Sequence, residues 1–261
     1  MGSEFDTCWL KIGRAEEHWN ILYAENKAWV DGIPYNSSKR CNEDGSRHSF
    51  VVDEIKKHPP LDRWSLIAGD CIHNLRSTLD ALVYVLAVRQ SGCNPPPDEK
   101  KLQFPIGDTP EGFEEQRKRF RIATLGTPAQ TLIERMQPYN RPHPDLPPLL
   151  SLLRDFSNRD KHRLLNVVIA NIQQVLISVE CLGDAPQSIQ QGYHQGPIQT
   201  GTEVAFVSVS PPRMDVACQF KAWIGISIEH PPGPSGRTFT QLVDILKLQT
   251  DEVKKIVGDA M

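Results

Sequence analysis

Long apolar runs are missing from this chain of 261 residues. Its most apolar stretches, around residues 79–88 and 164–170, fall well short of the roughly 20 residues that a membrane-spanning helix needs. The first residues also lack a basic start followed by an apolar run, so no secretory signal is expected. Together these absences predict a cytoplasmic protein that does not contact the membrane.

Paired cysteines of the CxxC type are also absent, and this argues against a zinc knuckle and against a disulfide framework. We therefore expect reduced thiols, with Cys71 in the hydrophobic core. The six cysteines are scattered along the chain: Cys8, Cys41, Cys71, Cys93, Cys181 and Cys218.

A large excess of one charge is missing as well, since 29 Lys and Arg residues face 32 Asp and Glu residues and the net charge is −3. A protein that coats nucleic acid nonspecifically needs many more cations, although a small local basic site stays open. The GxSxG, glycine-rich phosphate loop and HExxH signatures are also absent. The sequence therefore predicts no familiar hydrolase site, no resident metal and no cofactor.

Helical periodicity dominates the N-terminal half of the chain. Apolar residues recur every three or four positions in residues 6–30 and again in residues 62–89, which predicts two long antiparallel helices. Asp62 is expected to cap the second helix, because its carboxylate can accept the unpaired amide hydrogens of the first turn. Gly92 and the prolines after it are expected to end that helix.

The character of the chain changes after residue 163, where β-rich segments alternate with Gly and Pro turns before a final helical segment. An earlier segment, residues 48–57, is a strand or an extended arm. We therefore expect an α+β protein, with an N-terminal helical bundle packed on a C-terminal antiparallel β-sheet and a final helix. Residues 6–163 would form the helical region and residues 164–261 the sheet and last helix, together in one compact domain.

The second long helix carries a row of polar residues, Asp70, His73, Ser77 and Asp80, with Arg76 at its edge. Their spacing of three and four places the side chains near one another on the helix surface. Two interpretations stay open. The row is a solvated face with an Arg76–Asp80 ion pair, or it is part of a functional site.

A second polar cluster, Asp160, Lys161, His162 and Arg163, follows a leucine-rich helical segment. Histidine titrates near neutrality and can move protons, while Lys and Arg can stabilise the negative charge of a phosphate. The alternative is a solvated turn at the junction between helix and strand.

Four motifs in this chain, HNLRSTLD, FPI, QPY and DKHR, resemble those of a family of uncharacterised bacterial proteins of about this length. More distantly, the first motif is similar to the HEPN superfamily of helical domains. Many HEPN domains are metal-independent ribonucleases that use an Arg followed four to six residues later by a His. Here Ala81 stands at the His position after Arg76, so the resemblance implies that His73 or His162 moves the proton. HEPN-like domains frequently pair, which makes a homodimer the expected assembly.

The leading hypothesis is thus a HEPN-like protein that binds RNA or a nucleotide and cleaves RNA without a metal. The catalytic candidates are His73, Arg76 and His162, the phosphate-binding candidates are Lys161 and Arg163, and the orienting network is Asp70, Asp80 and Asp160.

Two alternatives come from other functional classes. In the first, the same residues form a structural polar network in a noncatalytic interaction protein. In the second, a metal-dependent hydrolase uses ligands drawn from both clusters: Asp70, His73, Asp160 and His162.

Overall fold

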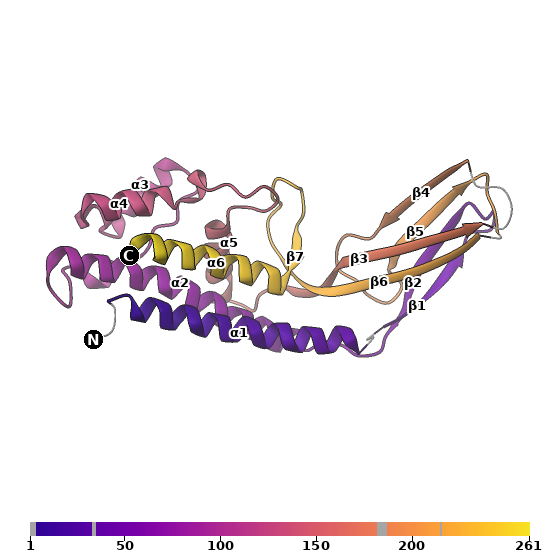
Figure 1. Cartoon of the computed structure of the whole chain (residues 1–261), viewed down its shortest axis with the longest axis horizontal. Coiled ribbons are helices and arrows are strands. Elements are labelled where there is room, and N and C mark those ends of the chain that lie inside the picture. Colours follow the sequence, from indigo (N-terminus) through magenta and orange to yellow (C-terminus); the bar gives the residue numbers. More distant parts are fainter. Residues whose placement is uncertain (1–3, 33–34, 182–186, 215) are drawn as a thin grey trace.

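A computed structural model describes residues 4–32, 35–181, 187–214 and 216–261, with the side chains of 171–181 and 217–223 excepted. Figure 1 shows an elongated molecule with the helices at one end and a four-stranded sheet at the other. Two long strands run from the helical end to the distal sheet. The architecture confirms the α+β class that the sequence predicts.

Six α-helices lie in the part of the chain that the structure describes. They are α1 (Asp6–Asp31), α2 (Leu61–Ser91), α3 (Pro110–Arg119), α4 (Thr127–Arg135), α5 (Leu149–Asp160) and α6 (Leu242–Ala260).

Helix α2 forms the centre of the helical end, because α1, α5 and α6 all pack against it. Leu75, Leu79 and Leu82 of α2 are fully buried, as the helical periodicity predicts. The helix ends at Gly92, which has a left-handed φ of 66° and donates its N–H to the Val88 carbonyl at 2.8 Å.

The expected cap of α2 was wrong by two positions. Pro60 is the N-cap residue, and Asp62 lies inside the first turn without a capping hydrogen bond. A carboxylate in the first turn still interacts favourably with the positive end of the helix dipole.

The strands form two antiparallel sheets, with orders β1-β2-β5-β4 and β3-β6-β7. They are β1 (Tyr35–Cys41), β2 (Arg47–Ile55), β3 (Val167–Cys181), β4 (Ser188–Tyr193), β5 (Glu203–Ser210), β6 (Val216–Glu229) and β7 (Phe239–Gln241).

Residues on both sides of position 163 contribute to both ends of the molecule. The hairpin of β1 and β2 precedes that position and pairs with β5, which follows it. Helix α6 comes last in the chain and packs against α1 and α2. Both termini of the described chain consequently lie at the helical end (Figure 1).

Two of the cysteine thiols are deeply buried. Cys71 is fully buried in α2, and burial raises the pKa of its thiol to about 12. Cys8 of α1 is also buried, with its pKa raised to about 11 for the same reason. The core position expected for Cys71 is confirmed, whereas the side chains of Cys181 and Cys218 lie outside the described residues.

Candidate functional site

The polar row of α2 faces two different neighbours. Arg76 and Asp80 lie against the backbone of Phe104, and Asp70 and His73 lie near Asp160 at the end of α5. The row is therefore neither a purely solvated face nor the wall of one common pocket. Its two halves need separate physical accounts.

Arg76 and Asp80 together hold the main chain of Phe104. Arg76 Nη2 donates to Asp80 Oδ1 at 2.9 Å and to the Phe104 carbonyl oxygen at 2.7 Å. Asp80 Oδ1 also accepts the Phe104 N–H at 2.9 Å. The expected ion pair is confirmed, but the Arg76 side chain is only 17% exposed, and burial lowers the pKa of its guanidinium. A phosphate could reach Arg76 Nη2 only by replacing these internal bonds.

Two glutamine side chains continue this clamp along the FPIG segment, which we define as residues 104–107. Gln116 of α3 accepts the Ile106 N–H and donates to the Ile106 carbonyl, both at 2.9 Å. Gln137 is fully buried, accepts the Gly107 N–H at 2.9 Å and donates to the Pro105 carbonyl at 3.0 Å. Side chains thus supply the hydrogen bonds that an extended segment outside any sheet lacks.

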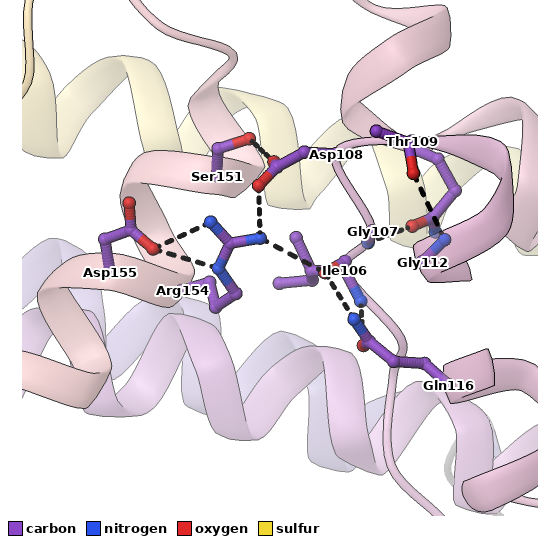
Figure 2. Close-up of polar contacts among 10 residues, drawn as sticks. Ile106, Gly107, Asp108, Thr109, Gly112, Gln116, Ser151, Arg154 and Asp155 are labelled. Atoms are coloured by element: carbon purple, nitrogen blue, oxygen red, sulfur yellow. Dashed lines mark hydrogen bonds and ion pairs between the residues drawn. The ribbon is translucent and has the colours of Figure 1, made fainter.

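Arg154 of α5 secures the residue that follows the FPIG segment. It donates to Asp108 at 2.8 Å through Nη1 and to Asp155 at 2.9 Å through Nε, while Ser151 donates to the other Asp108 oxygen at 2.5 Å (Figure 2). Arg154 Nη1 also lies 3.4 Å from the Ile106 carbonyl oxygen. Helices α2, α3 and α5 are therefore joined through one extended segment.

Asp160 connects the second cluster to α2. Its carboxylate lies directly over Gly69, because a β-carbon at that glycine would come within 2.2 Å of Asp160 Oδ1. Partial burial raises the pKa of Asp160, the nearby charge of Asp70 raises it further, and His73 opposes the shift. The first residue of the second cluster thus meets the N-terminal half of the polar row.

The next three residues, Lys161, His162 and Arg163, form an exposed turn between α5 and β3, at the junction of helix and strand that the sequence predicts. Within the described residues their side chains make no hydrogen bond or ion pair. A cleft of about 700 Å³ borders this turn, and Arg163 and Arg159 both line it. Arg159 itself donates to the Glu229 carbonyl at 3.3 Å. We call residues 161–163 the cationic turn, because it presents the exposed side chains of Lys161 and Arg163.

Among the described residues, no three His, Cys, Asp or Glu side chains lie close enough together to hold a metal ion. The four residues considered for such a centre are Asp70, His73, Asp160 and His162. Over the same part of the chain, no helix has the length and apolar character needed to cross a bilayer.

Sequence reasoning missed the roles of Gln116, Gln137 and Arg154. The QPY motif did single out the segment that contains Gln137, but a glutamine can equally well be a surface residue. Its function as a clamp depends on burial and on the facing backbone of residues 105–107. A cavity between α1 and α6 also gave no sequence signal.

Comparison of the chain with protein-family models, curated proteins and solved structures finds no match.

Proposed function

We propose that this protein binds RNA or a nucleotide through the cationic turn, and that it does so without using Arg76 as a catalytic group. The observation that carries the proposal is the contrast between the two clusters. Arg76 donates to Asp80 and to the Phe104 backbone, while Lys161 and Arg163 are exposed and unpaired within the described chain, and Arg163 lines a cleft. Unpaired cations are available to neutralise phosphates.

The same contrast disfavours the expected ribonuclease arrangement. A catalytic Arg must be free to hold the phosphate while a nearby His moves a proton. Here the Arg76 side chain is mostly buried and its guanidinium is bonded internally, although His73 and His162 are both exposed. The antiparallel pair of α1 and α2 and the HNLRSTLD motif support a HEPN-like helical region, and we retain both that assignment and the homodimer as parts of the proposal.

Binding can be measured by fluorescence anisotropy with a labelled single-stranded RNA of mixed sequence. The variant Lys161→Ala/Arg163→Ala is expected to bind more weakly and with a shallower salt dependence. The slope of log K against log salt should fall by about 0.7 for each phosphate that the variant no longer neutralises. The matched control is Lys100→Ala/Lys255→Ala, which removes the same charge from exposed positions elsewhere. Equal weakening in both variants would show nonspecific electrostatics and refute the site.

Incubation of the same RNA with and without EDTA tests for cleavage. We expect intact RNA in both arms. EDTA-insensitive cleavage lost in His73→Ala or His162→Ala would restore the ribonuclease hypothesis, and EDTA-sensitive cleavage would instead favour a metal-dependent hydrolase.

A noncatalytic interaction protein is the second candidate function. The clamp around the FPIG segment favours it, because three of the four sequence motifs are used to join α2, α3 and α5. Absence of any RNA or nucleotide binding would leave this candidate in place.

A further inference from the structure

A second cavity, of about 1070 Å³, lies where the C-terminal half of α1 and the first turns of α6 meet β7. Figure 1 shows α6 and β7 adjoining at this point, above α1. One stripe of α1 faces the cavity, including Trp19, Tyr23 and Asn26. The volume lies slightly above the range of about 300–1,000 Å³ that is typical of small-molecule sites in proteins.

The cavity wall concentrates polar atoms that have no partner. Eight buried side-chain nitrogen or oxygen atoms in the described residues lack a hydrogen bond, and three of them belong to residues of this wall. They are the donors Trp19 Nε1 and Gln241 Nε2 and the acceptor Asn26 Oδ1. Water cannot reach these three atoms, so a ligand gains free energy from them only where its binding turns the Trp19, Asn26 or Gln241 side chain toward the cavity.

Aromatic rings accompany these polar atoms. Trp19 and Phe239 are partly buried in the wall, whereas Tyr23 and Tyr193 are 53% and 54% exposed. Aromatic side chains provide stacking surfaces for planar rings, and amide and indole groups can bond to the edges of those rings. A flat ligand whose edge carries both donors and acceptors fits this combination.

Two cations extend the wall toward solvent. The side chains of Arg237 and Lys247 are exposed and form no ion pair within the described residues, whereas Lys27 is paired with Asp31. Lys247 also lies near Asp244, a carboxylate that offers an acceptor for a hydroxyl group. Phosphate and hydroxyl groups attached to a flat ring would thus find partners at the same opening.

We infer that this cavity binds the base and sugar of a nucleoside or nucleotide. The inference rests on the proposed function for its ligand class, but it names a different site. Thr238 lines both this cavity and the cleft beside the cationic turn, so the two sites adjoin.

The test uses adenosine and uridine, which carry no phosphate and therefore do not depend on the cationic turn. Binding to the full chain is measured by isothermal titration calorimetry, with glucose as a ligand that has hydroxyl groups but no aromatic ring. We expect at least one nucleoside to bind and glucose not to bind. Absence of nucleoside binding at millimolar concentration, or equal binding of glucose, overturns the inference.

Three variants locate the site. Trp19→Phe keeps an aromatic ring and removes the N–H, Gln241→Leu removes an amide nitrogen that has no partner, and Tyr193→Ala removes an exposed ring. None of these changes breaks a described side-chain hydrogen bond, so each variant is expected to fold. Tyr193→Ala should weaken nucleoside binding at least about fivefold, as loss of one stacked ring does.

The matched control is Trp9→Phe, which changes a surface tryptophan of the same helix outside the cavity. Nucleoside binding that is unchanged in all three cavity variants, or weakened equally in the control, refutes the site. If adenosine binds and RNA does not, the cavity stands and the cationic turn fails. If RNA binds through the turn and no nucleoside binds, the cavity fails and the proposed function stands.

Discussion

Replacement of Arg76 by Met separates a structural role from a catalytic one. The variant keeps most of the side-chain volume but removes the hydrogen bonds to Asp80 and to the buried Phe104 carbonyl. A hydrogen bond that involves a charged group contributes about 1.5–3 kcal/mol. Removing one partner of a fully buried ion pair costs about 3–5 kcal/mol.

The cost of about 3–5 kcal/mol is smaller for this pair, because the pair is partly exposed. The Asp80 side chain is 34% exposed, so water can partly solvate the carboxylate that loses its cation. Removal of Arg76 Nη1, which has no partner, also returns some free energy. We therefore expect Arg76→Met to lower the free energy of unfolding by about 2–3 kcal/mol.

Urea unfolding followed by circular dichroism measures this change, with the m-value as a check on two-state behaviour. The double variant Arg76→Met/Asp80→Asn tests the pair directly, because Asn keeps an acceptor for the Phe104 N–H but carries no charge. Its total loss should be smaller than the sum of the two single losses by about 1 kcal/mol.

Arg163→Ala is the contrasting variant, since this exposed residue lies in the cationic turn. Its unfolding free energy should stay within about 0.5 kcal/mol of the parent protein while RNA binding weakens. Arg76→Met should show the opposite result, with lower stability and unchanged RNA affinity in the folded protein. Full stability together with lost RNA binding or cleavage in Arg76→Met would refute the structural role.

Three other predictions concern buried groups. Because the pKa of Asp160 is raised above 3.8, the folded state binds that proton more tightly than the unfolded chain, and stability falls as pH rises beyond that value. Asp160→Asn should therefore increase the unfolding free energy at pH 7 and lose this advantage below about pH 3, as urea titrations at several pH values can show. Gln249 is 1% exposed and neither of its amide atoms has a partner, so Gln249→Met should stabilise the fold by about 1–3 kcal/mol in the same assay; a lower stability would indicate a hidden partner. In the native protein iodoacetamide should modify the exposed Cys41 long before the buried Cys71, as measured by mass spectrometry, and equal rates would contradict the burial.

The long helices were predictable because the spacing of their apolar residues shows which face of each helix is buried. The apolar residues of α2 repeat at helical spacing, and Gly92 provides a local stop. Strand β1 was not predicted, since its residues Tyr35–Cys41 are mostly polar and exposed. An edge strand of this kind takes its conformation from pairing with β2 rather than from its own alternation.

The candidate site was predictable only as a set of residue types. Spacing correctly joined Arg76 to Asp80, because an i,i+4 pair depends on the helix alone. It carried no information on Phe104, which lies 24 residues beyond Asp80, accepts a hydrogen bond from Arg76 and donates one to Asp80. Contacts of that kind depend on how the helices pack, and a single sequence does not encode them in any local pattern.

At the end of α5, a residue packed against α2 is followed directly by residues exposed to solvent. Asp160 lies over Gly69, where a side chain at position 69 would clash with the Asp160 carboxylate, yet Lys161 is already exposed. Both residues belong to one run of charged side chains, and the sequence alone does not show which of them has a functional role. Packing against α2 separates them, because the Asp160 side chain lies over the helix backbone whereas the next three side chains are exposed. The DKHR motif therefore combines one residue that positions the turn with three that the turn presents to solvent.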